Sequence, residues 1–599
     1  MRTLVMMGLA LLCQVVSVAA TIHVPADQPT IKAGINAAVN GDTVLVAPGY
    51  YYENLTFAGK AIIVKSSDGP EKTTIDGSMP QHGTLASVVM FRNGEGLDSV
   101  LDGFTIRGGR GTYTAYHKYG GGVFCEQASP MIVNNIIRFN KAHYGGGIAC
   151  KDHASPEISN NLIERNSTDV NSAGPIISKG GGIYCVEYSS PTISNNCITM
   201  NTTDPYYIYA NGGGIYCNAD SSPNISHNTI SDNVAGGRGC GIFISYSLAI
   251  ISNNTITGNR AGDFGGGIHC ANQSYPMIQN NTISGNSVKH DGGGIYFTYS
   301  FPSNISNNRI FLNSAANGGG TWCFSSSNPT LSNNMICGNT AEKNGGGIFF
   351  QGQNTLNLVS NTMAGNAATK GGGIFCSESA SLKLSNMIMW DDSASSGPEV
   401  YMDYSGQPAT LEADYSDVKG GLSSLYIETG IALNWGSHMY DADPHFVDSA
   451  GKDYHLVLNS PCRNKGDNTA TAALEDFEGD PRVAANTIDL GADEQYYHFY
   501  CTGNFTPGGV MKGKFIGTNI LNPVWLIIGS GIVDPPMAHN WGDLYLGAPW
   551  WVIPMGKLPV NGVLVVPQQI PATVAVPTDV PMQALINKKL TNLYVLEIR

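Results

Sequence analysis

A glycine triplet recurs ten times in the middle of this 599-residue chain. The triplets begin at residues 120, 145, 180, 212, 239, 265, 292, 318, 345 and 371, and the fifth reads Gly-Cys-Gly. Successive copies are 25 to 35 residues apart, and most intervals are 26 or 27 residues. A fixed period of this length is typical of a repeat architecture, in which each copy forms one unit and buries its apolar face against its neighbours.

Each copy contains three short apolar segments separated by turn residues. In one copy, Ile148 and Cys150 follow the glycines, Ile158 follows Ser-Pro, and Ile163 follows an asparagine. Apolar residues alternate with others inside segments of four to six residues, which is strand periodicity. Three strands in about 26 residues predict one coil of a parallel β-helix, with coils spaced about 4.8 Å apart.

Two asparagine positions accompany the strands. The first is occupied in all ten copies, by Asn135, Asn161, Asn196, Asn228, Asn254, Asn281, Asn308, Asn334, Asn361 and Asn386. The second, five residues later, is occupied by Asn140, Asn166, Asn201, Asn233, Asn259, Asn286, Asn313, Asn339 and Asn366, and by Asp391 in the tenth copy. Stacked amides hydrogen-bond along a column, so we expect ladders inside the turns. A row of asparagines that binds sugar or ice is the alternative.

Seven cysteines share one position, three residues after the triplet: Cys125, Cys150, Cys185, Cys217, Cys270, Cys323 and Cys376. Ile244, Phe297 and Phe350 occupy this position in other copies. Exchange of cysteine for isoleucine and phenylalanine predicts a buried apolar column and not a nucleophile or metal ligand. Cys462 and Cys501 lie outside the repeats and could pair, but connectivity does not follow from sequence alone.

The chain divides into four predicted parts. Residues 1–20 have an early arginine, an apolar run and a Val-Ala-Ala ending, which predicts a secretory signal peptide and a secreted or cell-surface protein. Residues 21–58 form a capping segment, in which Pro29, Ile31, Ile35 and Ala38 indicate a short amphipathic helix. Residues 59–494 form the β-helix with its C-terminal cap. Residues 495–599, with short strands between turns, predict an accessory β-sandwich.

Composition limits the partners. Only 13% of residues are charged and the formal net charge is −14, which argues against nucleic acid and anionic membranes because both require a basic surface. No stretch of 18 apolar residues follows the signal, so no transmembrane span is expected. A neutral polymer or a cation remains compatible with this surface. The sequence does not predict an oligomeric state.

Three long connections depart from the period: 108–119, 167–177 and 202–210. All three precede a triplet and should project from one edge of the solenoid, where binding residues of repeat proteins usually lie. Aromatic rings suit pyranose sugars, so we expect a polysaccharide or cell-surface glycan as ligand. The candidate ligand-binding residues are Tyr113, Tyr116, His117, Tyr119, Tyr144, Asp204, Tyr206, Tyr207 and Tyr209. Tyrosines that only pack the loops together are the alternative.

A second set of polar residues follows the cysteine position in four successive coils. It contains Glu126, Asp152, Glu187 and Asp220, together with Lys151 and His153. Stacking of coils should bring these side chains within several ångströms, which makes them weak catalytic candidates, and a solvated acidic turn is the alternative. Asp441, Asp443 and Asp448, and likewise Asp476, Glu478 and Asp480, lack the regular spacing of a calcium loop. We therefore expect solvated turns there, with no metal site and no cofactor; calcium binding by these carboxylates is the alternative.

The array GGGI…SP.I..N.I..N resembles the right-handed parallel β-helix repeat family, the pectate-lyase-like superfold of secreted bacterial proteins, over roughly residues 22–494. The opening PTIKAGINAAVNGDTVLVAPGYYYEN and the tail DPHFVD…DLGADE resemble the terminal segments of such proteins. The resemblance implies an all-β solenoid. In enzymatic relatives it implies polysaccharide lyases, hydrolases, esterases or epimerases, while many others have no known activity.

Catalytic patterns of that superfold match only in part. Calcium-dependent lyases use clustered carboxylates and a basic Arg or Lys, for which the set around Lys151 is the nearest counterpart. Asp391 and Asp392 lack the flanking residues of the hydrolases, and residues 49–53 match only the short G-x-Y-x-E signature of the esterases. We expect an exported, non-catalytic glycan-binding or adhesion protein; the alternative is a calcium-dependent polysaccharide lyase or a related carbohydrate-active enzyme.

Overall fold

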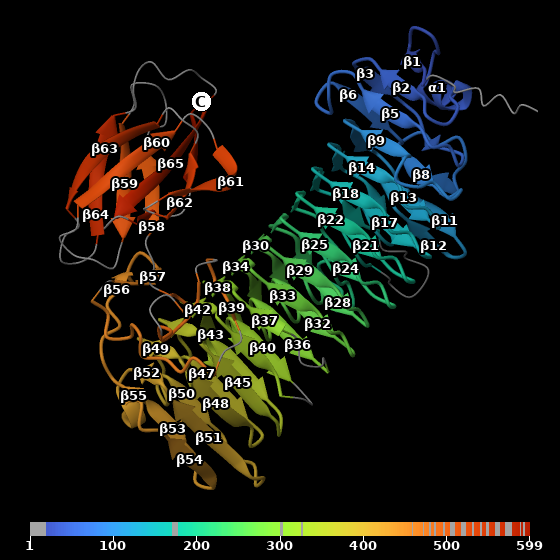
Figure 1. Ribbon diagram of the computed structural model, residues 1–599. Helices are drawn as coiled ribbons and strands as arrows, with labels where there is room; N and C mark the ends of the chain where they lie inside the picture. Colours follow the sequence, from blue (N-terminus) through green and yellow to red (C-terminus); the bar gives the residue numbers. More distant parts are fainter. Residues whose placement is uncertain are drawn as a thin grey trace, which may run out of the picture.

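A computed structural model describes residues 19–494 except 170–177, 300–303, 325–327, 458, 471–472, 479–480 and 484–486, and the backbone of ten strands after residue 497. Residues 1–18 of the predicted signal peptide lie outside the described residues. Nearly all the regular structure of the described chain is strand, and residues 21–440 wind into a long solenoid with α1 (Ile31–Ala37) at one end and β54 (Ile431–Trp435) at the other (Figure 1).

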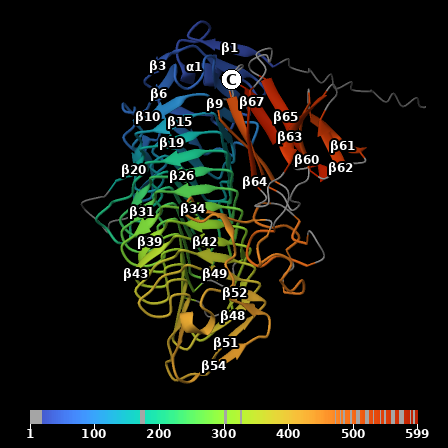
Figure 2. The same cartoon turned by 90° about the vertical axis from the view of Figure 1, so that its left-hand side faces the viewer.

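Three parallel sheets form the walls of the solenoid. The first has 16 strands, from β1 (Thr21–Val24) to β54, and the second has 15, from β3 (Gly49–Tyr51) to β55 (Met439–Tyr440). Each strand pairs with the matching strand of the next coil, and Figure 2 shows the strands of the second sheet stacked one above another. The predicted parallel β-helix with three strands per coil is confirmed.

The third sheet follows the glycine triplets and has 14 strands. They are β4 (Leu55–Thr56), β8 (Val89–Phe91), β13 (Val123–Glu126), β17 (Ile148–Lys151), β21 (Ile183–Cys185), β24 (Ile215–Cys217), β28 (Ile242–Ser245), β32 (Ile268–Ala271), β36 (Ile295–Thr298), β40 (Thr321–Phe324), β44 (Ile348–Gln351), β47 (Ile374–Ser377), β50 (Val400–Met402) and β53 (Leu425–Ile427). A representative coil continues from β32 through β33 (Met277–Gln279), β34 (Thr282–Ser284) and β35 (Ser287–Val288).

The core consists of columns of identical positions from successive coils. Cys150 pairs in register with Cys185, which pairs with Cys217, and the side chains of all three are completely buried. Burial raises the pKa of the Cys323 and Cys376 thiols to about 12, so these cysteines stay protonated and behave as small apolar residues. The prediction of a buried cysteine column is confirmed.

Two asparagine ladders run inside the turns, as predicted. The side-chain oxygen of Asn281 accepts from the backbone N–H of Asn254 at 2.9 Å, and its amide group donates to the carbonyl of Ile251 at 2.8 Å and to Oδ1 of Asn308 at 3.0 Å. The same pattern recurs from coil to coil, and the ladder asparagines are buried. Each amide therefore pairs backbone groups that the tight turn leaves without a strand partner.

The tenth copy is shifted by one residue, which corrects the predicted ends of both ladders. Met387, not Asn386, follows Asn361 in the first ladder, and its sulfur accepts from the Asn361 backbone N–H at 3.4 Å. Asp392, not Asp391, follows Asn366 in the second ladder and accepts from its side-chain amide at 2.9 Å. The inward-facing register of the strands fixes the ladder position, and a count of asparagines along the sequence does not.

A short helix covers the open end of the first coils, as predicted. Helix α1 has Thr30 as N-cap, and Glu53 accepts hydrogen bonds from the backbone N–H groups of Ile31 and Lys32, both at 2.9 Å. A carboxylate at a helix N-terminus pairs its unsatisfied N–H groups and complements the helix dipole. Glu53 of the G-x-Y-x-E match therefore has a structural role at this end of the solenoid.

After residue 497 the described backbone consists of antiparallel strands. They are β58 (His498–Gly503), β59 (Val510–Ile516), β60 (Pro523–Gly529), β61 (Ile532–His539), β62 (Gly542–Leu546), β63 (Trp550–Lys557), β64 (Val563–Gln569), β65 (Thr578–Ile586), β66 (Lys589–Leu590) and β67 (Tyr594–Ile598). They pair in one sheet of β58, β59 and β64, a second around β60, β63 and β65, and a hairpin of β61 and β62. Antiparallel sheets agree with the predicted accessory module. The Cys501 side chain lies outside the described residues.

The asparagine ladder predicts that Asn281→Ala greatly lowers the free energy of unfolding. The substitution leaves the Ile251 carbonyl and the Asn254 N–H buried without a partner, and each such group costs about 1–3 kcal/mol. We expect the free energy of unfolding, measured by denaturant titration, to fall by about 2–5 kcal/mol. Neighbouring Asn280 is exposed and has φ of +56°, so Asn280→Gly is the matched control and should change stability little. Equal effects of the two variants would contradict a stabilising ladder.

The close approach of coils predicts that Gly266 accepts no side chain. A Cβ atom at Gly266 would lie 2.5 Å from the carbonyl oxygen of Gly293 and 2.9 Å from that of Ser287, both backbone atoms. We expect Gly266→Ala to destabilise the chain by about 1–3 kcal/mol or more, measured as a lower thermal midpoint.

The control for Gly266 is Gly285, which has φ of +60° and no neighbouring atom closer than 3.9 Å to the added Cβ. Asp232 adopts a similar φ of +52° at the same place in another coil. Gly285→Asp should therefore be tolerated, because aspartate enters the left-handed region more readily than most residues. If Gly285→Asp lowered the thermal midpoint and Gly266→Ala did not, the close approach of the coils at Gly266 would not be what excludes a side chain there.

The buried carboxyl group of Asp392 should make the stability of the chain depend on pH. Burial raises its pKa to about 7, and burial together with the charge of Asp392 raises the pKa of Glu399 to about 11. The folded state thus holds the Asp392 proton more tightly than the unfolded state, whose pKa is about 4, so its contribution to stability declines between about pH 4 and 7. Asp392→Asn restores the amide and should stabilise the chain by roughly 1–3 kcal/mol at pH 7 but little at pH 4. Thermal midpoints that run parallel across this range would contradict the prediction.

Candidate functional site

The outward face of the third sheet carries an aromatic stack that the sequence analysis missed. From Tyr184 the rings of Tyr216, Phe243, His269 and Tyr296 follow one another at centroid distances of 4.7–5.3 Å. The stack continues through Trp322, Phe349, Phe375, Tyr401 and Tyr426. From Tyr184 to Tyr401 each ring covers the face of the next and every ring is at most 8% exposed, so these rings offer no face to a sugar; only Tyr426 at the end of the stack is 42% exposed. The signal was present, as an aromatic two residues after most triplets.

Two of the predicted binding tyrosines belong to this stack. Tyr119 and Tyr144 are each only 8% exposed, and their ring centroids lie 4.9 Å apart. Tyr144 stacks in turn on Tyr184 at 4.7 Å. Burial raises the pKa of Tyr119 to about 12. Both tyrosines pack the corner of the coils, and neither presents a ring face to solvent.

The first long connection is a hairpin. Strands β11 (Gly111–Thr114) and β12 (His117–Tyr119) pair antiparallel, and β7 (Leu85–Ala86) extends them to a three-stranded sheet. Tyr116 at its tip is 86% exposed, and Tyr113 lies with its ring 5.3 Å from the Lys118 ammonium. His117 packs edge-on against Tyr144 at 5.3 Å. The hairpin therefore holds Tyr113 and Tyr116 outside the coil.

The insert at 202–210 is seated firmly on the next coil. Cβ atoms at Gly236 and Gly237 would lie 2.1 Å from the Asp204 carbonyl oxygen and 2.3 Å from that of Ile208. Asp204 caps the turn by accepting from the Tyr206 N–H at 2.9 Å, and Tyr207 packs edge-on against Tyr209. The side chains of Tyr206 and Tyr209 are nevertheless 94% and 57% exposed, and Ile208 is also exposed.

The hairpin and the insert leave the solenoid at the same corner. Tyr119, which ends the hairpin, forms a parallel bridge with Tyr144, which bridges to Lys179, which bridges to Asn211 after the insert. Three coils therefore separate the two projections, about 14 Å at the usual strand spacing. The prediction that they share one edge is confirmed for these two; of the connection at 167–177, residues 170–177 lie outside the described part.

The acidic turns form balanced ion pairs and not a cluster of free carboxylates. Lys151 lies 2.9 Å from Glu187 and 3.6 Å from Glu126, and Glu126 also pairs with Arg92 at 2.6 Å. Burial lowers the pKa of Lys151, but Glu187 and Glu126 outweigh it and hold the pKa above its ordinary value. A lysine that acts as a general base must lose its proton near neutral pH. Lys151 is thus a fixed positive charge.

Among the described residues, the other members of this predicted set form no ion pair with Lys151. Hydrogen bonds from His153 and from Gln127 lower the pKa of Asp152, and His153 stacks on Tyr188 at 5.2 Å. Asp220 lies one position later in its turn, where its backbone N–H donates to the Tyr246 carbonyl. The structure therefore brings Glu126, Lys151 and Glu187 together and leaves Asp220 outside that group.

The acidic residues of the C-terminal cap agree only in part with the solvated turns that the sequence predicts. Asp443 and Asp448 each accept a backbone N–H from their own turn, as expected of turn residues, whereas Asp441 accepts from the N–H of Gly420. Asp476, for which the sequence predicts a solvated turn, is instead 1% exposed, and its carboxylate accepts the N–H groups of Glu478 and Glu494 inside the cap. Asp480 lies outside the described residues. Within the described residues, one group of possible metal ligands converges, namely His455, Glu478 and Asp493.

Comparison with solved structures finds similar chains at low sequence identity. The Agl-KA catalytic domain matches at 12% identity over 68% of this chain, with a TM-score of 0.26. The match spans 64% of that domain, less than two thirds of its length. The enzymatically active domain of tailspike protein 2 from bacteriophage CBA120 matches at 9% identity over 97% of this chain and 75% of that chain, with a TM-score of 0.25.

Comparison by sequence identifies the repeats. No curated protein matches the chain. In the described part of the chain, no helix is long and apolar enough to cross a membrane. The family described as "Right handed beta helix region" matches residues 86–274 and 213–388, which together cover just over half of the 599 residues. With the stacked parallel sheets and asparagine ladders described above, this match shows that the chain belongs to the right-handed β-helix family.

Proposed function

We propose that this protein is exported and binds an extended glycan, without cleaving it, through the hairpin and the insert at one edge of the solenoid. The observation that carries the proposal is the insert at 202–210. Its backbone is seated against Gly236 and Gly237, yet Tyr206 and Tyr209 extend into solvent. Large apolar side chains that remain exposed on a fixed support are typical of binding surfaces.

The spacing and charge of this edge support a polymer as ligand. Tyr116 on the hairpin and Tyr206 on the insert belong to projections about 14 Å apart, which suits a chain of several sugar rings better than a single sugar. Tyrosine combines an apolar ring with a polar hydroxyl, as a pyranose requires. The weakly charged, net acidic composition favours a neutral glycan. The signal-like residues 1–20 support export.

The alternative, a calcium-dependent polysaccharide lyase, draws less support. Its base would be Lys151, whose pKa is held high by Glu187 and Glu126. Its calcium ligands would be the carboxylates of the same turns, but Glu126 and Glu187 are paired with Lys151 and Asp152 with His153. Fold alone does not decide between binding and catalysis on this scaffold.

The test measures binding and product formation together on the full chain. We expect binding to one member of a panel of neutral and acidic polysaccharides, with no unsaturated or reducing-end products, with or without calcium. The Tyr206→Ala/Tyr209→Ala double variant should bind at least about tenfold more weakly, since contacts of one buried aromatic side chain contribute about 1.5–3 kcal/mol.

Tyr52→Ala provides the matched control. Tyr52 is 57% exposed, the same fraction as Tyr209, but lies in the N-terminal capping segment, so this variant should bind normally. Products that disappear in Asp152→Ala and Glu187→Ala would replace the proposal with the lyase. Equal loss of binding in Tyr52→Ala and in the double variant, or no binding at all, would also refute it.

A further inference from the structure

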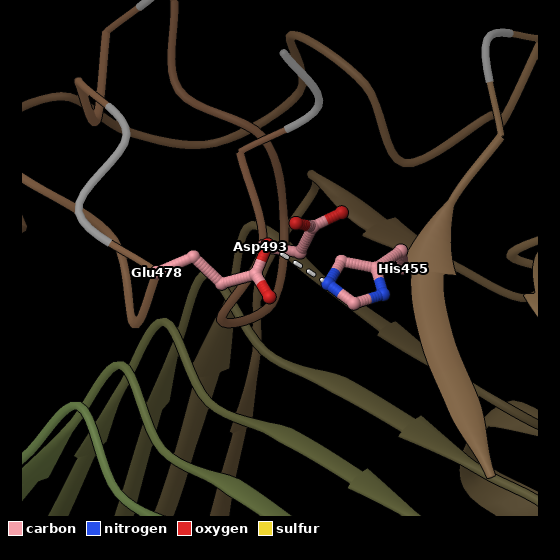
Figure 3. A group of neighbouring side chains, drawn as sticks. All are labelled: His455, Glu478 and Asp493. Carbon is pink, nitrogen blue, oxygen red and sulfur yellow. Dashed lines mark ion pairs between the residues drawn. The ribbon is translucent and has the colours of Figure 1, made fainter. Parts of the chain in front are cut away.

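Three side chains from separate segments converge in the C-terminal cap, which packs against the outside of the second sheet through residues such as Tyr454 and Phe477. His455 lies on β57 (Asp453–Leu456), whereas Glu478 and Asp493 lie on two later loops (Figure 3). Their nearest ligand atoms all lie within 4.8 Å of one another, and Nε2 of His455 is 3.0 Å from Oε2 of Glu478. This cluster is remote from the tyrosine-bearing loops and has no part in the glycan proposal.

The imidazole of His455 is held in one orientation by a second carboxylate. Its Nδ1 contacts Oδ1 of Asp453, two residues earlier on the same strand. A histidine that donates from one ring nitrogen to a carboxylate presents the other nitrogen, in a fixed direction, to a metal ion. Here that other nitrogen is Nε2, which faces Glu478.

Asp493 has an unused acceptor in this cluster. Its side chain is 2% exposed, and one oxygen accepts from the Leu456 N–H at 2.8 Å. The other oxygen, Oδ1, has no hydrogen-bond partner among the described residues. A buried carboxylate oxygen without a partner is costly, and it lies beside two further acidic residues, Asp476 and Glu478, whose charges act on Asp493. A bound cation would satisfy the oxygen and offset the charge.

We propose that His455, Glu478 and Asp493 bind one divalent transition-metal ion of the zinc class, with Asp453 as the residue that orients the histidine. Donor atoms around a tetrahedral zinc ion at about 2.0–2.2 Å lie about 3.4 Å from one another, so the three atoms need to close by at most about 1.5 Å. An imidazole ligand favours zinc over calcium and magnesium, which prefer oxygen ligands only.

The ion would join three segments that no described disulfide connects. His455, Glu478 and Asp493 are separated by 22 and 14 intervening residues, and the connecting loops contain little regular structure. Because the ligand set exists only when the cap is folded, the free energy of metal binding adds to the stability of the cap. Glu478 reaches the surface, which provides an entry path and leaves a coordination position for water. The role is therefore to hold the irregular cap together where it packs against the outside of the second sheet.

The test uses the full chain, without an affinity tag, stripped with a chelator and then titrated with zinc. We expect one zinc ion per chain by elemental analysis and calorimetry, and a thermal midpoint that rises with zinc and falls again with excess chelator. Glu478→Gln, at the most accessible ligand, should fold normally and lose at least about tenfold in affinity. Asp453→Asn keeps all three ligands and should weaken binding by roughly 10–100-fold.

His438→Gln is the matched control, because His438 forms a similar contact with Asp414 at 3.3 Å but lies outside the cluster. It should bind zinc as the unaltered chain does. The proposal is overturned if the unaltered chain takes up no stoichiometric zinc, if calcium binds more tightly than zinc, or if Glu478→Gln and His438→Gln bind equally well. Because the readouts are metal content and thermal midpoint, failure here is distinct from failure of glycan binding.

Discussion

In-register hydrogen bonding between successive coils is the constraint on which the rest of this structure depends. Because Ile268 pairs with Ile295 and Cys270 with Phe297, any residue type that recurs with the repeat becomes a continuous column. Apolar positions become the core, asparagines become ladders, and aromatic residues become a stack. A single residue contributes little, but its repetition gives the amides inside each ladder and the rings inside the stack a partner above and below. Glycine triplets permit this because the coils meet backbone to backbone at Gly266 and its equivalents.

The same constraint explains what sequence could and could not predict. The cysteine and asparagine columns recur at fixed intervals, so their burial and pairing followed from periodicity. Tyr119 and Tyr144 were assigned to binding because they lie beside the inserts, but the register places them in the aromatic stack. Counting asparagines along the sequence predicts Asn386 as the next ladder residue, whereas the strand register places Met387 at that position. Periodicity thus predicts a column well and its last member poorly. Contacts with the cap determine where the asparagine ladder ends, since Asn386 hydrogen-bonds the backbone of Asp467 and not a ladder asparagine.

Candidate binding residues were harder to predict wherever they depart from the repeat. The exposed tyrosines of the insert could be found, because a change in the interval marks an inserted loop. Their accessibility could not, since it depends on how the backbone of 204–208 meets Gly236 and Gly237. Glu478 stands out in the sequence only as part of an acidic run, and nothing there joins it to His455 and Asp493, because the three residues come from non-repeating segments with irregular spacing. Only the folded cap brings them together.

A regular solenoid has no intrinsic end and no intrinsic site, so both must come from residues that interrupt it. At the first coils, helix α1 and Glu53 occupy the open end. At the last coils, the ladder terminates on the buried carboxyl of Asp392, and the irregular cap with its acidic cluster follows. Along the side, two projections on one corner carry the exposed tyrosines. The repeat therefore sets the positions and distances of these features, while the interruptions supply their chemistry, and for that reason we place function in the interruptions.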